Sequence, residues 1–459
     1  MQAVLLIDFG STYTKVTIVD LISEEIIGTA RAGTTIETNI MDGLKAALAQ
    51  IPEPVEGWNF IRKLACSSAA GGLKMIASGL VKELTAEAAR RAALGAGARV
   101  LEVFSYELTP QDLDKISASQ PDILLLAGGT DGGNKEVLLK NAEMLSRLTT
   151  RLPVVIAGNK VVSAQAADLL RKRHDPVVVA ENVMPELGVL SVESARLAIR
   201  DVFLTHIIKA KGLDKAEEFI EKIMMPTPAA VLSAAELLAQ GYGSERGMGE
   251  LMIVDVGGAT TDVHSIAKGD PSKPSVMFKG LPEPFAKRTV EGDLGMRFSS
   301  EALVETTGKQ LLDYLGWTED QVACQLGLCK EDPWRIPKTE EEAKFDVAMG
   351  RMAVSLAVDR HVGTLEVVYT PFGATYVQHG KDLTQLPVII GTGGVLLYNP
   401  GASEILQGAI FNPNEPTILK PQKPHFYMDK EYILAAMGLL REVAPLVALR
   451  IMKKYVVKQ

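Results

Sequence analysis

Two stretches of the sequence share a pattern of residue types that suits phosphate chemistry. In each, an apolar run ends in an Asp, which is followed by any residue, a Gly, small residues, a Thr and a second apolar run. The first copy has Asp8 and Gly10, and the second has Asp255 and Gly257. The two Asp residues are 255 − 8 = 247 positions apart, so the pattern is an internal repeat. Because short glycine motifs often match by chance, the repetition is stronger evidence than either copy alone.

Each copy predicts a hairpin with a carboxylate at the end of its first strand. A glycine lets the turn approach a ligand closely, and successive N–H groups there form a concavity that binds anions. A carboxylate repels phosphate, so we expect Asp8 and Asp255 to hold Mg²⁺ through water, with the metal bridging to phosphate oxygens. Two such hairpins would grip a polyphosphate from both sides. The alternative is that each is only a glycine-containing hairpin with a buried, capped Asp.

A third motif of small residues follows the apolar run 388–390. Small residues in a turn after a buried strand leave room for a flat base or a ribose against the backbone. The expected nucleotide-binding residues are Gly10, Ser11, Thr12, Gly257, Gly258, Thr260, Thr261, Gly391, Thr392, Gly393 and Gly394.

The elements that must position these motifs follow from the apolar pattern. Residues 3–32 alternate between apolar strands and turns. From 73 to about 180, short apolar strands alternate with helices, which is typical of a parallel sheet built from βαβ crossovers. A helix is expected at 215–224, and the region 283–387 is expected to be mainly helical. The sequence therefore predicts an α/β fold.

Composition and charge narrow the function classes. The 459 residues are 47% hydrophobic and 23% charged, which is typical of a globular protein with a substantial core. A formal net charge of −8 gives no cationic field for nucleic acid or an anionic bilayer, so neither is expected as a partner. Three cysteines are too few for a disulfide framework, and no run of about 18 apolar residues predicts a membrane span. We expect a cytoplasmic protein.

Together, the three motifs resemble the phosphate-1, phosphate-2 and adenosine motifs of the actin, sugar-kinase and Hsp70-type ATPase superfamily. The resemblance implies a duplicated ribonuclease-H-like core, with ATP or ADP and Mg²⁺ between two lobes. It also implies that Lys15 contacts phosphate, that Gly292 lies beside the adenosine, and that Thr227 opens a connecting helix. The expected organisation is a first half of the ATPase core at 1–72, an inserted parallel α/β module at 73–190, connecting helices at 191–245 and a second half of the core at 246–459.

The chain departs from the superfamily pattern at one catalytic position. In Hsp70 proteins a glutamate precedes the Pro-Thr of the connecting helix and positions the attacking water, whereas this chain has Met225 there. Either ATP hydrolysis is slow or another carboxylate serves. The candidate catalytic carboxylates are Asp262 and Glu291, in addition to Asp8 and Asp255, which are also the expected metal-binding residues.

Over nearly its whole length the chain resembles a narrower branch, the methylaspartate (glutamate) mutase accessory proteins, which are related to the hydantoinase and oxoprolinase group. The stretches that carry this match are 8–15, 66–73, 126–134, 181–186 and 255–262. The resemblance implies an adenosylcobalamin-dependent mutase as partner and a chaperone-like role that uses ATP to restore enzyme carrying damaged cofactor. The family is sometimes labelled with the name of the mismatch-repair ATPase, but this chain has neither that protein's ATP-site motifs nor a basic patch for DNA.

Several alternatives stay open. On the same scaffold the chain would serve as an ATP-dependent hydantoinase- or oxoprolinase-type amidohydrolase, a small-molecule kinase or an actin-like filament protein. His264 lies in a near match to the Asp-x-His-x-x-Gly signature of cobalamin-binding domains, but Ala267 replaces the glycine, so direct cobalamin ligation is not expected. The glycine-rich loop 128–134 is interpreted as a plain βα turn, and Cys66 as a buried thiol at a strand end.

Overall fold

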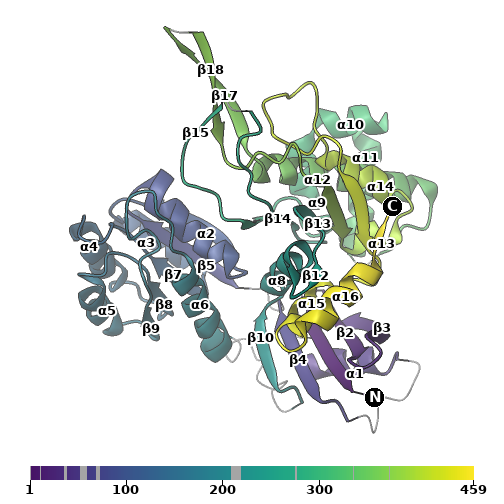
Figure 1. The fold of residues 1–459 in the computed structure, drawn as a ribbon, viewed down its shortest axis with the longest axis horizontal. Coiled ribbons are helices and arrows are strands. Elements are labelled where there is room, and N and C mark those ends of the chain that lie inside the picture. The colour runs from purple at the N-terminus through teal and green to yellow at the C-terminus, as the bar shows by residue number, and fades with distance from the viewer. Residues whose placement is uncertain are drawn as a thin grey trace. The chain divides into compact units, whose positions relative to one another are not determined.

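The computed structural model describes residues 2–10, 12–35, 39–51, 59–68, 73–207, 219–273, 276–333, 335–371 and 373–459 (Figure 1). The chain forms two compact units. Unit 1 comprises Met1–Ser233, Gly280–Pro282 and Ala435–Val447, and unit 2 comprises Ala234–Lys279, Glu283–Leu434 and Ala448–Gln459.

The central sheet of unit 1 has the strand order β10-β4-β1-β2-β3. Its strands are β1 (Ala3–Phe9), β2 (Tyr13–Asp20), β3 (Glu25–Gly33), β4 (Arg62–Ser67) and β10 (Lys222–Pro226). The strands β1, β2 and β3 are antiparallel neighbours, while β4 runs parallel to β1 and β10 runs parallel to β4. Helix α1 (Ile40–Leu48) packs against β2 and β3. Every residue of β1 is buried, as expected for the middle strand.

The central sheet of unit 2 repeats this arrangement. Its strand order is β16-β14-β13-β19-β20-β21. The strands are β13 (Leu251–Val256), β14 (Thr261–Ile266), β16 (Ala286–Glu291), β19 (Val388–Thr392), β20 (His425–Asp429) and β21 (Val456–Lys458). The strands β13, β14 and β16 are antiparallel neighbours, and β19 and β20 continue in parallel from β13. Three antiparallel and two parallel strands in this order form a ribonuclease-H-like sheet, which unit 2 extends by the antiparallel strand β21, so the predicted duplicated core is confirmed.

Unit 1 contains a second, fully parallel sheet of order β6-β5-β7-β8-β9. Its strands are β5 (Lys74–Gly79), β6 (Arg99–Ser105), β7 (Ile123–Leu126), β8 (Val154–Ile156) and β9 (Val177–Val179). The helices of this region are α2 (Glu87–Gly95), α3 (Pro110–Ser119), α4 (Glu136–Leu145), α5 (Ser163–Arg171) and α6 (Glu193–Val202), with π-helical turns at Lys82–Ala86 and Phe203–Ile207. The strand and helix alternation predicted from residue 73 onward is confirmed.

Three helices contain residues of both units. They are α8 (Thr227–Gln240), α15 (Leu434–Arg441) and α16 (Pro445–Tyr455). The other α-helices, all in unit 2, are α9 (Ser300–Thr307), α10 (Lys309–Leu315), α11 (Glu319–Glu331), α12 (Glu340–His361), α13 (Gly394–Tyr398) and α14 (Ala402–Leu406). A short hairpin, β11 (Gly241–Tyr242) and β12 (Glu245–Arg246), follows α8.

The expectation that 283–387 is mainly helical is wrong in part. Besides its helices, this region contains β16 and the antiparallel strands β17 (Thr364–Thr370) and β18 (Gly373–His379). Val367, Val368 and Tyr369 are β-branched or aromatic residues, which favour strands over helices.

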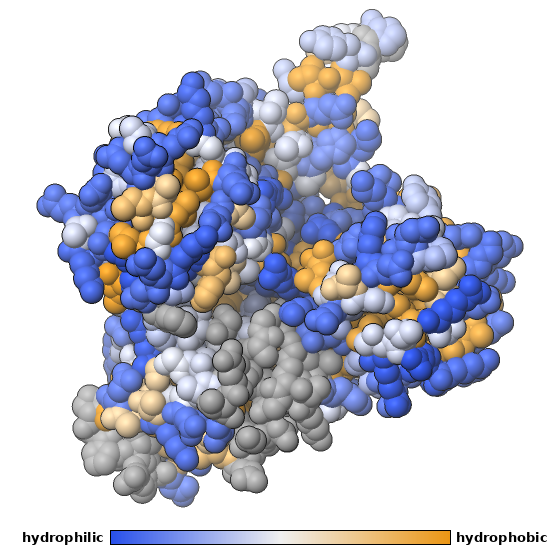
Figure 2. All heavy atoms as spheres, turned by 180° about the vertical axis from the view of Figure 1, so that it is seen from behind, coloured by the Kyte–Doolittle hydropathy of each residue, from blue (hydrophilic) through white to orange (hydrophobic). Residues whose placement is uncertain are grey.

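The strands β17 and β18 form a small sheet with β15 (Val276–Phe278), and apolar side chains show on its surface (Figure 2). The exposed large hydrophobic residues of this sheet are Met277, Phe278, Val367, Tyr369 and Tyr376. A sheet of three short strands has too little interior to bury its own aromatic side chains.

The predicted helix 215–224 is wrong where the structure describes it, because strand β10 begins at Lys222. Ile223 and Met225 are buried beside β4, so completing the sheet outweighs the helical pattern of the sequence. Residues 215–218 lie outside the described residues.

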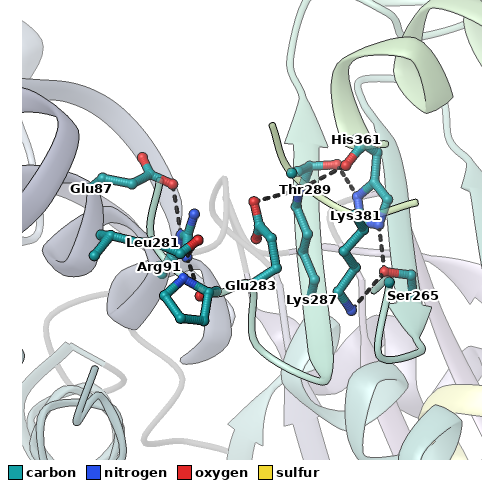
Figure 3. Close-up of polar contacts among 12 residues, drawn as sticks. Glu87, Arg91, Ser265, Leu281, Glu283, Lys287, Thr289, His361 and Lys381 are labelled. Carbon is teal, nitrogen blue, oxygen red and sulfur yellow. Dashed lines mark hydrogen bonds and ion pairs between the residues drawn. The ribbon is translucent and has the colours of Figure 1, made fainter. Parts of the chain in front are cut away.

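One short segment of the later chain belongs to unit 1. Leu281 is 4% exposed and lies in the hydrophobic core that also contains residues of β1 and α2. Arg91 on α2 donates to the Pro282 carbonyl oxygen at 2.7 Å and is held in turn by Glu87 at 2.8 Å (Figure 3). In the part of the chain that the structure describes, no helix is long and apolar enough to span a bilayer.

Candidate functional site

The turn between β1 and β2 is closed by one backbone hydrogen bond. The Gly10 amide donates to the Tyr13 carbonyl oxygen at 3.0 Å. A Cβ atom added to Gly10 would lie 2.5 Å from that same oxygen, so the turn requires glycine. Thr34 braces the turn, since its hydroxyl donates to the Gly10 carbonyl oxygen at 2.8 Å and its amide donates to that of Thr12 at 3.0 Å. Ser11 lies outside the described residues.

Asp8 stands at the end of β1, and its carboxylate has partners on three other elements. Lys15, opposite Asp8 on β2, donates from Nζ to Oδ2 at 3.1 Å. The hydroxyl of Thr227, the first residue of α8, donates to Oδ1 at 2.6 Å. The Cys66 thiol, opposite Asp8 on β4, lies 3.6 Å from Oδ1. The predicted residues Asp8 and Lys15 therefore lie together, and two further residues join them.

The thiol of Cys66 is buried, as the sequence predicts. Burial, together with the nearby negative charge of Asp8, raises the pKa of Cys66 well above its ordinary value. The group therefore stays protonated and is a weak donor toward Asp8, not a nucleophile. Its contact with Asp8 could have been expected, because the carboxyl ends of parallel neighbours such as β1 and β4 meet at one edge of a sheet.

The turn between β13 and β14 in unit 2 is closed in the same way as that of unit 1. The Gly257 amide donates to the Thr260 carbonyl oxygen at 2.9 Å. A Cβ atom added to Gly257 would lie 3.0 Å from that oxygen. The next residue, Thr261, is fully buried and donates from its hydroxyl to the Leu294 carbonyl oxygen at 2.6 Å.

The loop 292–299 packs on this turn. The amide of Arg297 donates to the Gly258 carbonyl oxygen at 2.8 Å. The Ser299 hydroxyl is 2.8 Å from the carbonyl oxygen of Gly292 and 2.9 Å from that of Ala259, so it links loop and turn. Gly292, expected beside the adenosine, thus lies next to the second glycine turn.

Asp262, one of the expected catalytic carboxylates, is paired with a cation. Arg288 on β16 donates to its Oδ1 from Nε at 3.0 Å and from Nη2 at 2.6 Å. The Thr260 hydroxyl donates to Oδ2 at 3.0 Å. The side chains of Arg288 and Asp262 are only 3% and 14% exposed. Because a largely buried charge pair is costly to separate, Asp262 has a structural role in the hairpin whatever else it does.

Glu291, the other expected catalytic carboxylate, is also paired. It ends β16 opposite Thr261 and accepts from Arg360 Nη1 at 2.7 Å. Arg360, near the end of α12, also donates to Asp293 at 2.8 and 2.9 Å. These bonds lower the pKa of Asp293 and raise that of Arg360.

Asp255 is the second-last residue of β13, as Asp8 is of β1. It lies opposite Asp262 on β14 and opposite Thr392 on β19. Gly393 has a φ of +103°, and a Cβ atom added there would lie 2.9 Å from Asp255 Oδ1 and 2.4 Å from the Val256 carbonyl oxygen. The second Asp–Gly hairpin and the late glycine motif therefore meet in unit 2.

The remaining residues of the late glycine motif shape the end of β19. The Thr392 hydroxyl donates to buried Asp429 at 3.2 Å. A Cβ atom on Gly391 would lie 2.9 Å from the sulfur of Met428, whereas one on Gly394, the first residue of α13, would meet nothing within 4 Å. Gly391 is thus closely packed against neighbouring side chains, and Gly394 leaves open space.

The far ends of β14 and β16 are anchored by buried polar contacts (Figure 3). The two ring nitrogens of His361 lie 2.8 Å from the hydroxyl oxygens of Ser265 and Thr289. Lys381, which has no exposed surface, donates to two backbone carbonyl oxygens at 2.7 and 2.8 Å. These contacts hold in place the two strands that carry Asp262 and Glu291.

His264 lies inside the unit 2 sheet, where it is 1% exposed. Burial, assisted by the positive charge of Arg288, lowers the pKa of His264 to about 3. The imidazole is therefore neutral near pH 7 and forms part of the second hairpin strand.

The glycine-rich loop 128–134 is held by side-chain amides. Asn159 donates to the Thr130 carbonyl oxygen at 2.8 Å, and Asn182 donates to that of Gly129 at 2.9 Å. The loop follows β7 and precedes α4, in agreement with its interpretation as a βα turn.

Carboxylates such as those of Asp8 and Asp255 are oxygen ligands of the kind that a magnesium ion accepts. Among the residues that the structure describes, no three His, Cys, Asp or Glu side chains gather to hold a metal by themselves. Magnesium in nucleotide sites usually keeps several waters and uses one or two carboxylates plus phosphate oxygens. Asp8 and Asp255, each beside a glycine turn, supply that kind of ligand.

The paired sheets and paired Asp–Gly hairpins define a class, the duplicated ribonuclease-H-like proteins to which actin and sugar kinases belong. Within that class, the model of the family described as MutL protein matches residues 4–456. The chain is 56% identical over 465 residues to "Protein MutL" of Clostridium tetanomorphum, and the match covers 100% of both chains. The chain belongs to the MutL protein family.

The solved structures that match this chain have little sequence in common with it. A diol dehydratase-reactivating factor in nucleotide-free form is 11% identical, with a TM-score of 0.36, over 96% of this chain and 99% of that one. Xylulose kinase from Lactobacillus acidophilus is 12% identical, with a TM-score of 0.35, over 100% and 93%. Glycerol kinase from Plasmodium falciparum with ADP is 11% identical, with a TM-score of 0.36, over 99% and 92%.

Proposed function

We propose that the chain is an ATP-binding accessory protein that reactivates an adenosylcobalamin-dependent glutamate (methylaspartate) mutase. Membership of the MutL protein family and the near-complete match to a second member support an accessory protein of this branch. A DNA-repair role is not implied by the family label, because the net charge of −8 offers no field for a phosphate backbone.

One observation carries the nucleotide assignment. Two glycine turns, 247 residues apart, have the same register, the same closing hydrogen bond and an Asp at the same position. In our proposal the turn amides donate to phosphate oxygens, and Asp8 and Asp255 hold Mg²⁺ through water. Bound Mg²⁺ supplies charge neutralisation among the phosphate oxygens, and Lys15 adds a further positive charge.

The proposed ATPase is slow. Met225 is 2% exposed in β10 and offers no carboxylate to orient water. Asp262 and Glu291 are both engaged by arginines, which disfavours either as a mobile base. In our proposal ATP binding draws the two lobes together and hydrolysis releases them. The nucleotide shifts the equilibrium between the closed and the open state only by the difference in its affinity for these two states.

Calorimetric titration with ADP and a non-hydrolysable ATP analogue, with and without Mg²⁺, tests nucleotide binding. Asp8→Asn and Asp255→Asn should each lose most of the gain in affinity that Mg²⁺ provides. Asp20→Asn is the matched control, because Asp20 lies at the opposite end of the first hairpin. Absence of ADP and ATP uptake by the wild-type chain would refute the proposal.

Reactivation is tested by mixing the chain with inactivated glutamate mutase, adenosylcobalamin, ATP and Mg²⁺. Recovery of mutase activity only when ATP is present is the expected result. ATP turnover stimulated by hydantoin, oxoproline or a sugar, without recovery of the mutase, would support an amidohydrolase or kinase instead. Pelleting of the chain with ATP during sedimentation would support a filament protein.

A further inference from the structure

The carboxylate of Asp8 has chemically different partners on its two oxygens. Oδ1 accepts the Thr227 hydroxyl at 2.6 Å and lies 3.6 Å from the Cys66 thiol. Oδ2 accepts the Lys15 ammonium group at 3.1 Å. Asp8 itself is 5% exposed, so these partners, and not bulk water, satisfy most of its carboxylate.

The partners of Oδ1 are fixed in the fold, whereas the partner of Oδ2 can move. Cys66 is fully buried in β4, and Thr227 begins α8, so neither shifts without disturbing a strand or a helix. Lys15 carries its charge on a long flexible side chain that is 20% exposed. A cation arriving at Asp8 would meet Oδ2, and repulsion would drive the Lys15 ammonium toward the accompanying anion.

We infer that Thr227 is the positioning residue of Asp8. Its hydroxyl, backed by the Cys66 thiol, turns Oδ1 inward and leaves Oδ2 as the oxygen that faces the metal. Lys15 occupies the place of the cation until Mg²⁺ arrives. The inference rests on the proposed function, because it states how the magnesium and nucleotide site of unit 1 is set.

A hydroxyl bound to a carboxylate is well suited to this task. Hydrogen bonds to an ionised oxygen are shorter and about twice as strong as neutral ones, and the 2.6 Å separation lies in that short range. If Thr227 served only as the polar first residue of α8, removing its hydroxyl would destabilise the fold without changing the affinity of Asp8 for a cation.

The test compares Thr227→Val, which keeps the shape but loses the hydroxyl, with Thr227→Ser, which keeps the hydroxyl. Thr17→Val is the matched control, because Thr17 is a buried threonine of the same sheet. Two binding readouts are used: Mn²⁺ alone, followed by its electron paramagnetic resonance signal, and ADP with and without Mg²⁺.

Thr227→Val should bind Mn²⁺ roughly tenfold more weakly and lose a similar share of the Mg²⁺-dependent gain in ADP affinity. Its ADP affinity without Mg²⁺ should change less than about twofold, as should both affinities of Thr227→Ser and Thr17→Val. Equal losses in Thr227→Val and Thr17→Val, or none in Thr227→Val, would overturn the inference while the proposed function stands.

If wild-type protein binds neither Mn²⁺ nor ADP, the proposed function and the inference fail together. If Thr227→Val does not fold, Cys66→Ala tests the same oxygen. It removes the weaker partner of Oδ1, so we expect Mn²⁺ affinity to fall roughly threefold. Wild-type Mn²⁺ affinity in Cys66→Ala would contradict the inference.

Discussion

The two glycine hairpins have the same backbone but opposite charge arrangements. The closing hydrogen bonds are 3.0 Å in unit 1 and 2.9 Å in unit 2. Across the hairpin from the turn carboxylate stands Lys15 in unit 1 and Asp262 in unit 2. Unit 1 therefore compensates Asp8 within the hairpin, whereas unit 2 places two acids opposite each other and supplies Arg288 from the next strand.

This difference separates the residues that the turn backbone requires from the cross-strand side chains, which vary with their surroundings. A Cβ atom at Gly10 would lie 2.5 Å from a carbonyl oxygen of its own turn, so that turn requires glycine, and a Cβ atom at Gly257 would make a tight contact of 3.0 Å with the equivalent oxygen. No such constraint acts on the cross-strand side chains, and they differ: Thr17 in unit 1 corresponds to His264 in unit 2. The two hairpins are therefore structurally equivalent without being electrostatically interchangeable.

The largest effect is expected from removing the cation of unit 2. Arg288→Met would leave the Asp262 carboxylate largely buried and uncompensated, since the two side chains are 3% and 14% exposed. We expect a loss of about 3 kcal/mol in the free energy of unfolding, measured by urea denaturation.

A double variant checks the cause. Adding Asp262→Asn to Arg288→Met removes the stranded charge and should recover at least about 1 kcal/mol of the loss. If the two losses simply add, the charge pair is not what stabilises the hairpin.

The second-largest effect concerns the late glycine motif, which contacts the hairpin of unit 2. Gly393→Ala places a Cβ atom 2.4 Å from the Val256 carbonyl oxygen at a φ of +103°. We expect a loss of about 2 kcal/mol, measured by thermal unfolding, together with weaker ADP binding. The neighbour Gly394 is the control, because a Cβ atom there meets nothing within 4 Å. Similar losses in Gly393→Ala and Gly394→Ala would show that the close approach to Asp255 is not strained.

Acid should weaken unit 2 through His264, whose counterpart in unit 1 is the uncharged Thr17. Burial, with a smaller contribution from Arg288, lowers the pKa of His264 to about 3, while the imidazole of an unfolded chain titrates near pH 6.5. Only the unfolded chain gains a proton between these values, so this contribution to stability is complete above pH 6.5 and lost as pH falls toward 3.

The matched variant is His264→Thr, which copies Thr17 of unit 1. At pH 7 it should be less stable than wild type, because it leaves space in the sheet. Between pH 7 and pH 5 the difference in free energy of unfolding should narrow by about 2 kcal/mol. A gap that stays constant over this range in urea titrations would mean that His264 takes up its proton over the same pH range in the folded and the unfolded protein.

Much of the architecture follows from local patterns. The repeat predicts both hairpins, and the strand and helix alternation predicts the parallel sheet of unit 1. These predictions succeed because burial of one face of a strand or helix makes apolar residues recur at a regular spacing in the sequence. The strands β17 and β18 were missed because their apolar residues follow neither period strictly.

The contacts that complete the candidate site are not local. Thr227 reaches Asp8 across 219 positions, and Cys66 reaches it across 58. Arg288 lies diagonally to Asp262, because its direct partner in register is His264. A sequence motif names the residues of one turn, whereas these partners depend on which strands become neighbours and in what register.

The smallest effect is expected in unit 1, from removing the cation that pairs with Asp8, as Arg288→Met removes the cation that pairs with Asp262. Lys15→Met removes the ammonium group from Asp8, but Oδ1 keeps the Thr227 hydroxyl and Lys15 was 20% exposed. Partly exposed ion pairs contribute little, so the free energy of unfolding in urea should fall by less than about 1 kcal/mol. A loss as large as that of Arg288→Met would mean that both hairpins depend equally on their cations. A small loss would leave Lys15 as a charge that the fold can release, as the proposed binding of a magnesium nucleotide at Asp8 requires.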